Sequence, residues 1–353
     1  MAYTDIDDPS AYFQTKLYTG GTAEAKTFDG NSNLKPDWFW SKKRGAVQSH
    51  QTADSVRGIA NSLRTDSTIA EYTNSETDDL ASFDTNGFTF SGTGDTYNGT
   101  YQSSSYVAWC WSAGGGTASS NTDGSITSSV SANTTSGFSI VSYTGTGSTG
   151  TVGHGLGATP SMIIIKERNN STSWIVYHHK NTSAPATDYL LLNSTQATDD
   201  YADYFNDTAP TSSVFTIDTA GDINGSSDTY IAYCFAEKKG FSKFGSYTGN
   251  GNADGTFVYT GFSPSFVMVK ASSTTGNWTM FDNKRSPFNF VDNHLYANTS
   301  AAEQTASAGY IDFLSNGFKK TDTFNNASGQ TYIYMAFAES PFVTSTGIPT
   351  TAR

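Results

Sequence analysis

Histidine is the side chain best suited to acid–base chemistry and metal binding near neutral pH, and the chain has five. His178 and His179 are adjacent, so they are the first pair to consider for a zinc site. Adjacent residues of a strand point to opposite faces, which predicts that the two rings are separated. The internal repeat described below also places Asp54 and Asp282 at the position of His178. A polar strand end explains all three residues, and the sequence therefore predicts no metal site and no cofactor.

Carboxylates are the second group that could carry chemistry. A glycosidase needs two of them at a working distance, and Asp78-Asp79, Asp199-Asp200 and Asp203 are available. All of them lie in polar segments, where solvated loops or loosely bound divalent cations are the alternatives. The glycine-rich segment 153–157 precedes a proline-led strand rather than a helix, so it lacks the helix dipole of a phosphate site. We therefore predict no catalytic residue and no enzymatic activity.

Aromatic residues are abundant, with 6 Trp, 20 Tyr and 23 Phe. Most occupy strand positions and are expected in the core. The others lie among polar loop residues, namely Tyr97, Tyr101, Tyr201, Tyr204 and Phe205. Such rings suit stacking on sugar faces or contacts with proteins, and the sequence leaves both functions open.

Three segments of the chain resemble one another in order and spacing. A Tyr-Thr-Gly triplet recurs at corresponding places, beginning at Tyr18, Tyr143 and Tyr247, which are 125 and then 104 residues apart. A proline-led apolar strand that ends in lysine follows at 36–42, 160–166 and 264–270. Further landmarks are His50, Trp174 and Trp278, then Leu63, Leu190 and Leu295, and finally the central alanines of an aromatic closing strand, Ala108, Ala232 and Ala336. The constant order and the nearly constant offsets, with a small insertion or deletion at the leucines, indicate a threefold internal duplication.

The apolar runs are short, rich in β-branched and aromatic residues, and bounded by turn dipeptides such as Asn86-Gly87 and Asn316-Gly317. This pattern predicts an all-β protein of three tandem homologous antiparallel β-sandwich domains of jelly-roll or lectin-like type. The expected boundaries are an N-terminal attachment arm at 1–15, sandwich repeat 1 at 16–113, a Gly/Ser/Thr-rich linker at 114–136, repeat 2 at 137–237, repeat 3 at 238–340 and a C-terminal tail at 341–353. The linker is expected to be flexible or extended, because 16 of its 23 residues are Gly, Ser or Thr.

The formal net charge of -12 argues against nucleic acid as a partner. No run of 18 apolar residues and no signal peptide is visible in the sequence. We therefore expect that the protein is made in a host cytoplasm and does not insert into a membrane. Cys110 and Cys234 fall at equivalent core positions of two different repeats, with Ala338 aligned to them in the third. Such positions are distant in tandem domains, which predicts two buried free thiols and no disulfide.

Three segments carry a resemblance to a known group of proteins: Ile6 to Thr15, Phe138 to Gly147 and Met335 to Phe342. Together they resemble virion proteins of marine tailed bacteriophages of the cyanophage and pelagiphage type, and the resemblance covers nearly the whole chain. It implies a structural or tail-fibre-like role on the virion and no catalytic residues. In a fibre, the N-terminal segment would dock on the tail, and its attachment residues would be Asp7, Asp8, Pro9, Tyr12 and Phe13.

The expected function is therefore that of a tail fibre or receptor-binding protein, which adheres to the host without covalent chemistry. A capsid decoration protein is the alternative, and a polysaccharide depolymerase is a third hypothesis. The expected partners are other virion proteins of the tail or capsid and host cell-surface polysaccharide or protein. A homo-oligomer, by analogy with fibres a homotrimer, is also expected.

Overall fold

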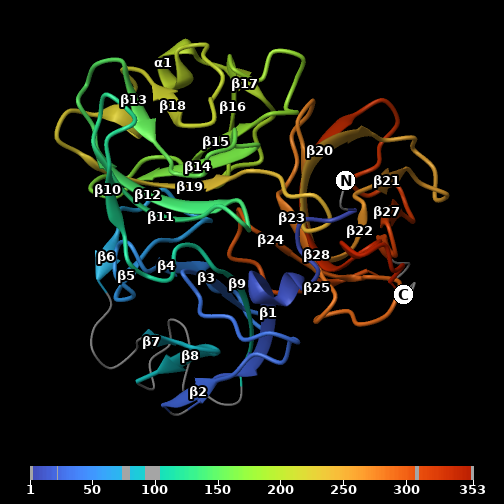
Figure 1. Ribbon diagram of the computed structural model, residues 1–353. Coiled ribbons are helices and arrows are strands. Elements are labelled where there is room, and N and C mark those ends of the chain that lie inside the picture. Colours follow the sequence, from blue (N-terminus) through green and yellow to red (C-terminus); the bar gives the residue numbers. More distant parts are fainter. Residues whose placement is uncertain (1–2, 22, 74–79, 92–103, 307–309, 351–353) are drawn as a thin grey trace.

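Strands dominate the computed structural model, which describes residues 3–21, 23–73, 80–91, 104–306 and 310–350 (Figure 1). The prediction of an all-β fold is confirmed. The helical elements within these residues are one 3-10 turn and two helices of four residues each. Within the same residues, no helix has the length and apolar character needed to cross a membrane.

The elements of the first repeat are η1 (Pro9–Ala11), β1 (Phe13–Thr19), β2 (Glu24–Lys26), β3 (Trp38–Lys43), β4 (Gln51–Asp54), β5 (Asn61–Ser62), β6 (Tyr72–Thr73), β7 (Leu80–Asp84), β8 (Gly87–Phe90) and β9 (Ser105–Trp111). Those of the second are β10 (Ser119–Asn121), β11 (Ser128–Asn133), β12 (Phe138–Thr144), β13 (Gly150–Gly153), β14 (Met162–Glu167), β15 (Ile175–His178), β16 (Asp188–Leu191), β17 (Asp199–Asp200), α1 (Ala202–Phe205), β18 (Val214–Ile217), α2 (Gly221–Asn224) and β19 (Thr229–Phe235). Those of the third are β20 (Ser242–Thr248), β21 (Phe257–Tyr259), β22 (Phe262–Ala271), β23 (Thr279–Asp282), β24 (Asn293–Tyr296), β25 (Gln304–Thr305), β26 (Ile311–Leu314), β27 (Gly317–Lys320) and β28 (Thr331–Pro341).

Each repeat is a two-layer, sandwich-like unit. Its large sheet contains the closing strand at an interior position, in the orders β1-β9-β3-β4, β10-β11-β12-β19-β14-β15-β16-β17 and β20-β28-β22-β23-β24-β25. A small sheet covers the outer face, in the orders β2-β8-β7, β13-β18 and β21-β27-β26. A separate hydrophobic cluster fills each sandwich. The closing strands therefore carry apolar residues on both faces, because each face is covered.

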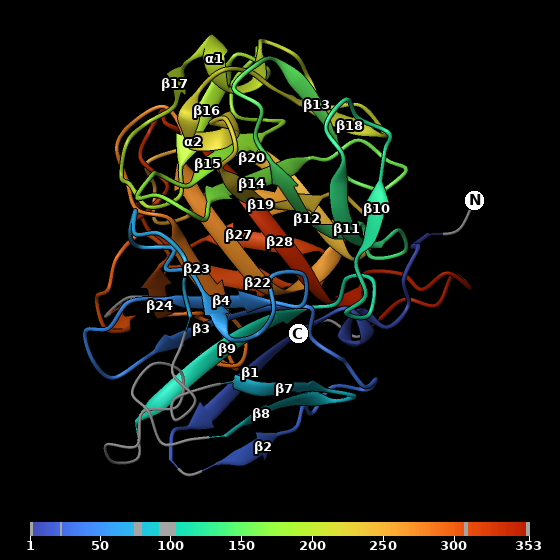
Figure 2. The same ribbon diagram turned by 90° about the vertical axis from the view of Figure 1, so that its left-hand side faces the viewer.

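The inner faces of the three large sheets share one further core. Its largest members come from all three repeats, and the rings of Trp111, Phe235 and Phe337 contact one another in a closed triangle. Their centroids are 6.4, 6.0 and 5.7 Å apart. Figure 1 shows the three lobes arranged around this centre, and Figure 2 shows them from the side. The three repeats thus form a ring around a pseudo-threefold axis and share one core.

Equivalent hydrogen bonds close this ring. The indole Nε1 of Trp174 donates to the Arg64 carbonyl at 2.9 Å, and that of Trp278 donates to the Leu191 carbonyl at 2.9 Å. The imidazole Nε2 of His50, at the position of the two tryptophans, lies 2.9 Å from the Tyr296 carbonyl. Repeat 2 thus bonds to repeat 1, repeat 3 to repeat 2, and repeat 1 to repeat 3.

The segment predicted as a linker forms two strands of the second sheet. β10 pairs with β11, and β11 pairs with β12 from Ser128–Tyr143 to Asn133–Phe138. Ser and Thr are compatible with a strand when the neighbouring edge supplies the backbone partners, so composition alone misidentified this segment.

The closing strand of the third repeat is displaced by two residues from its alignment in the sequence. Cys110 pairs with Phe39 and Cys234 with Ile163, whereas the equivalent Val267 pairs with Ala336. Ala336, and not Ala338, therefore occupies the cysteine position. The prediction of free thiols is confirmed, because both cysteines are buried and unpaired in two different sandwich cores.

The N-terminal segment packs on the rest of the chain. The Asp5 N–H donates to the Lys239 carbonyl at 3.0 Å, and Asp8 accepts from the Ser10 N–H at the start of η1. The Phe13 ring stacks on Phe337 with centroids 5.0 Å apart. Asp7 accepts from the Ser345 N–H at 2.6 Å, Pro9 is buried, and Tyr12 contacts Phe241 edge-on at 5.9 Å. The residues predicted as an N-terminal attachment arm therefore pack against the rest of the chain, and their attachment role stays a prediction.

Candidate functional site

An aromatic hollow of about 390 Å³ lies on the outer side of the second repeat, where α1, α2 and β16 meet. Tyr201, immediately before α1, exposes 45% of its surface at the rim. Its ring packs edge-on against Tyr204 at 5.0 Å, and Tyr204 packs edge-on against Tyr189 at 4.7 Å. The hollow is therefore lined by three tyrosines whose rings support one another, and we name it the tyrosine hollow.

Carboxylates border the same hollow. The Tyr204 hydroxyl donates to Asp222 Oδ2 at 2.8 Å, and the Tyr189 hydroxyl donates to Asp199 Oδ2 at 3.4 Å. Burial, followed by Asp222, raises the pKa of Tyr204, and burial, followed by Asp199, raises the pKa of Tyr189. A hydrogen bond with Asp203 raises the pKa of Tyr201. The three phenols therefore stay neutral, and the carboxylates keep free lone pairs that can accept further hydrogen bonds.

Two of the predicted recognition residues, Tyr201 and Tyr204, meet in this hollow. Phe205 is buried and contacts Tyr177 edge-on at 5.7 Å, so it supports α1 from below. Tyr97 and Tyr101 lie outside the described residues. The sequence analysis did not select Tyr189 and Asp222. They lie 12 residues before and 21 residues after Tyr201, in β16 and α2, and only the fold brings these elements together.

All five histidines are held in hydrogen bonds to the protein. His178 pairs with Met162 in the same register in which Asp54 pairs with Trp38 and Asp282 with Phe266, so the predicted equivalence is confirmed. The expected separation of His178 and His179 is wrong, because β15 ends at His178 and the two rings lie 5.6 Å apart. Burial lowers the pKa of His178 to about 3. This ring therefore stays neutral and structural at physiological pH.

The remaining candidates do not assemble into a reactive centre. Asp199 and Asp200 form the exposed strand β17, and Asp78 and Asp79 lie outside the described residues. Within the described part of the chain, no group of three or more His, Cys, Asp or Glu side chains could hold a metal ion. In the glycine-rich segment the His154 imidazole accepts from the Leu156 N–H at 3.2 Å, which fills the loop with its own side chain.

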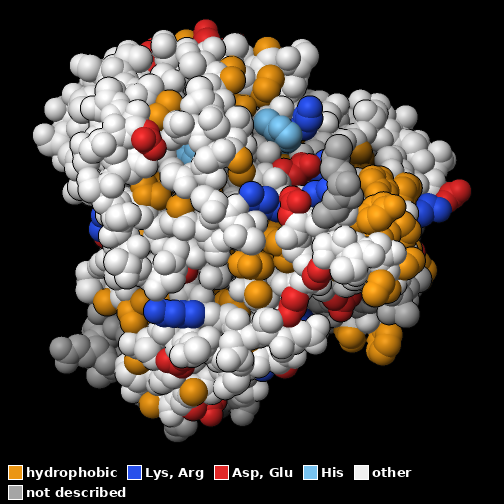
Figure 3. Space-filling view, in the orientation of Figure 1, with side chains coloured by type: hydrophobic (Ala, Val, Ile, Leu, Met, Phe, Trp, Pro, Cys, Tyr) orange, Lys and Arg blue, Asp and Glu red, His pale blue; other side chains and the backbone are white. Residues whose placement is uncertain are grey.

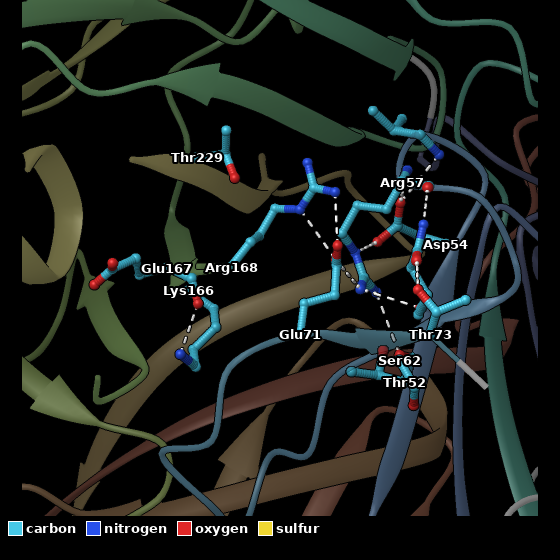
Figure 4. A network of polar contacts seen from close by, with 12 residues as sticks. Thr52, Asp54, Arg57, Ser62, Glu71, Thr73, Lys166, Glu167, Arg168 and Thr229 are labelled. Carbon is cyan, nitrogen blue, oxygen red and sulfur yellow. Dashed lines mark hydrogen bonds and ion pairs between the residues drawn. The ribbon is translucent and has the colours of Figure 1, made fainter. Parts of the chain in front are cut away.

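Among the described residues, an ion-pair network of the same kind lies at two of the three interfaces between repeats. At the 1–2 interface Arg57 bonds to Asp54 at 2.5 Å and to Glu71 at 2.8 Å, and Arg168 of the second repeat bonds to Glu71 at 2.7 Å. Figure 4 shows Glu71 between the two guanidinium groups. The Tyr233 hydroxyl also donates to Asp54 at 2.8 Å. These ion pairs hold the two repeats together.

The 3–1 interface repeats this ion-pair network, and the described part of the 2–3 interface does not. At the 3–1 interface the same network is formed by Asp282, Arg285, Glu303 and Arg44. At the 2–3 interface the equivalent positions hold neutral groups, and the Thr198 hydroxyl donates to Asn181 Oδ1 at 2.6 Å. The Thr198 N–H donates to the Ser272 carbonyl at 2.9 Å, as the Glu71 N–H does to the Arg168 carbonyl at 2.8 Å. The backbone geometry of the interface is thus conserved between repeats while its charge is not.

Residues 8–341 match a family described as a domain of unknown function, DUF7483. The chain belongs to this family. No curated protein matches the sequence significantly. In this DUF7483 protein the matched region contains all three repeats, so the family model describes the whole ring and not a single sandwich.

Proposed function

We propose that this DUF7483 protein is a bacteriophage virion component, a tail fibre or receptor-binding protein, that adheres to host surface polysaccharide through the tyrosine hollow. The observation that carries the proposal is the exposed ring of Tyr201, fixed edge-on by Tyr204 beside the carboxylate of Asp222. The resemblance of the sequence to marine phage virion proteins supports the location.

The chemistry of the hollow suits a sugar. The C–H face of a pyranose ring packs on an aromatic face, and its hydroxyls donate to carboxylates that have free lone pairs. A volume of about 390 Å³ falls within the ordinary range of small-ligand sites. Because the three phenols stay neutral and hold the rings in place, the arrangement supports binding of a sugar by stacking and hydrogen bonds.

The first test is binding of lipopolysaccharide and capsular polysaccharide purified from marine cyanobacterial hosts, measured by surface plasmon resonance. Tyr201→Ala should weaken binding about tenfold, because it removes a stacking contact of about 1 kcal/mol together with its buried area. Tyr201→Phe keeps the ring and should bind nearly as well as the wild type. Tyr259→Ala, which removes an exposed tyrosine from the third repeat, is the matched control. Equal binding by Tyr201→Ala and the wild type would reject the tyrosine hollow as the receptor site.

A capsid decoration protein is the second candidate, and the pseudo-threefold ring favours it. A chain whose three lobes surround one axis can be placed on a threefold position of an icosahedral shell. Quantitative mass spectrometry of purified virions, normalised to the major capsid protein, separates the two candidates. Tens of copies per particle support a tail protein, whereas hundreds support decoration.

A further inference from the structure

The first long strand of each aligned repeat occupies the same place in every large sheet. β1, β12 and β20 each pair with the closing strand of their repeat. The other side of β12 is covered by β11, whereas β1 and β20 are the first strands of their sheets among the described residues. Two of the three repeats therefore present a sheet edge where the second repeat has an added strand.

The backbone of β20 shows which groups face this edge. The Gly249 N–H donates to the Gln330 carbonyl at 2.9 Å, and the Ala338 N–H donates to the Phe241 carbonyl at 2.8 Å. The odd-numbered residues of β20 thus bond to β28, and the even-numbered residues point to the open side. Two of these groups are capped by side chains, because the Phe244 carbonyl lies 2.7 Å from His179 Nε2 and its N–H donates to Glu237 at 3.4 Å.

Ser246 is the next residue on the open side. It is exposed, and within the described part of the chain neither its N–H nor its carbonyl has a hydrogen-bond partner in the structure. Two hollows of about 430 and 310 Å³ adjoin it and have Ser246 and Lys180 in common. We name them together the β20 groove, which is lined by Ser161, His179, Lys180, Ser183, Ser246 and Ser272. Figure 3 shows histidine and charged side chains gathered on this face, where the lobes of the second and third repeats meet.

The 1–2 interface shows what fits such a groove. There Ser142 and Ile140, the equivalents of Ser246 and Phe244, pair with Ser129 and Ser131 of β11. The β11 strand has the sequence SSVSAN, and Ser131 is buried, with its hydroxyl accepting from the Gly114 N–H at 2.9 Å. An extended segment with small side chains therefore fills this position once within the chain itself.

Charge adds a preference. Lys243 pairs with Glu237 at 2.6 Å, whereas Lys180 forms no ion pair with a described carboxylate. A strand in the β20 groove with an acidic side chain opposite Lys180 would form an ion pair with that lysine. In a second copy of the chain, β11 already covers β12 and is therefore not free to enter the groove.

We propose that the β20 groove receives an extended segment of a partner protein as an added antiparallel strand. The segment has small side chains, as β11 has, and an acidic residue that faces Lys180. Its main chain bonds to the N–H and carbonyl of Ser246, which is the usual basis of recognition at a sheet edge. This site is separate from the tyrosine hollow and does not depend on the proposed function.

The test uses the full-length protein and a fluorescent synthetic peptide with the sequence of residues 125–136, in which Ser129 is replaced by Asp. Wild-type protein should bind it saturably in fluorescence anisotropy. Ser246→Pro removes the N–H that the added strand needs and should weaken binding at least tenfold, whereas Ser246→Ala should not. Proline is tolerated at an edge position whose N–H faces outward, and Gly245 before it accommodates the restriction that proline imposes.

Two further measurements complete the test. The unsubstituted peptide should bind more weakly than the Asp peptide, and Lys180→Gln should abolish that difference. Amide hydrogen exchange of Ser246 in the wild type should slow when peptide is bound, which tests the site even if Ser246→Pro unfolds. Absence of saturable binding at millimolar peptide, or an unchanged Ser246 exchange rate with peptide bound, would overturn the proposal. Tyr201→Ala should bind the peptide as the wild type does. The peptide result therefore does not depend on whether the tyrosine hollow binds a glycan.

Discussion

Lys320 lies in the sandwich core of the third repeat with none of its surface exposed, and its Nζ has no hydrogen-bond partner. The ammonium is 5.3 Å from the ring centroid of Phe281 and 5.8 Å from that of Phe324. Burial lowers its pKa to about 7. The equivalent positions of the first and second repeats hold Phe90 and Ile217. A basic residue thus replaces a hydrophobic one at a repeated core position.

Other buried lysines of the chain have hydrogen-bond partners for their ammonium groups, so their burial is less destabilising than that of Lys320. Lys42, Lys166 and Lys270 occupy equivalent positions, and the Nζ of each donates to the carbonyl of the following residue at 2.6 to 2.7 Å. Burial lowers the pKa of all three to about 8. Because backbone carbonyls satisfy these ammonium groups and nothing satisfies Lys320, substitution of Lys320 should have the larger effect on stability.

We predict that Lys320→Met stabilises the protein. At pH 6 the native state must hold an ammonium in an apolar core, so the substitution should raise the free energy of unfolding by roughly 2–4 kcal/mol. Between pH 7 and 10 the native lysine loses its proton before the unfolded one does, so wild-type stability rises with pH. The gain from Lys320→Met should therefore shrink over this window. Urea unfolding at pH 6 and pH 9 measures both effects.

Lys319→Met is the matched control for this prediction, because its side chain is partly exposed and pairs with Asp254 on the surface. It should change the free energy of unfolding by less than about 0.5 kcal/mol at either pH. A loss of stability in Lys320→Met at pH 6 would show that the ammonium is satisfied by a group that the structure does not place near it.

At the scale of elements, the sequence predicted the strands of each repeat from their landmarks but not how the repeats meet. The offsets of Trp174 and Trp278 show that they are equivalent, and nothing local shows that their indoles bond to a neighbouring repeat. The two-residue displacement of β28 is also invisible in the sequence, because its alternating apolar residues fit either register. In the candidate site, Tyr201 and Tyr204 could be selected as aromatic residues in a polar segment, whereas Asp222 required the position of α2.

We predict that the interfaces between repeats differ in their response to acid. Burial alone would raise the pKa of Glu71, but the guanidinium groups of Arg168 and Arg57 hold it below its ordinary value of 4.5. A depressed pKa contributes stability above pH 4.5, and that contribution is lost as pH falls through the native pKa. Glu71→Gln should therefore destabilise the protein by about 1–3 kcal/mol at pH 7 and by progressively less below pH 4.5.

Thermal and urea unfolding from pH 3 to pH 7 measure this difference. Thr198→Val at the equivalent position of the 2–3 interface is the control, and it should cost about 1 kcal/mol at every pH because no charge is involved. A pH-independent loss in Glu71→Gln would mean that the ion network contributes by shape and hydrogen bonding and not by charge.

The whole molecule is a ring in which every repeat contributes one face of its large sheet to a common core. Ile140, Ile164 and Ile231 of the second repeat lie in that core, as do Trp38 and Trp109 of the first. A single repeat can fill its own sandwich, but it cannot cover this second apolar face. One chain thus already supplies a threefold arrangement, and the homotrimer expected for a fibre remains a prediction about a further level of assembly.

We predict that the ring unfolds as one unit and that an isolated repeat does not fold as a soluble monomer. The fragment of residues 119–237 would expose the inner face of its large sheet, which is an apolar patch far larger than monomers ordinarily present to water. It should therefore aggregate, or bind a hydrophobic dye without native near-ultraviolet circular dichroism. Scanning calorimetry of the full chain should give one transition, with calorimetric and van't Hoff enthalpies that agree. Separate transitions, or a folded monomeric fragment, would mean that the three sandwich cores determine stability and that the common core forms only after each repeat has folded.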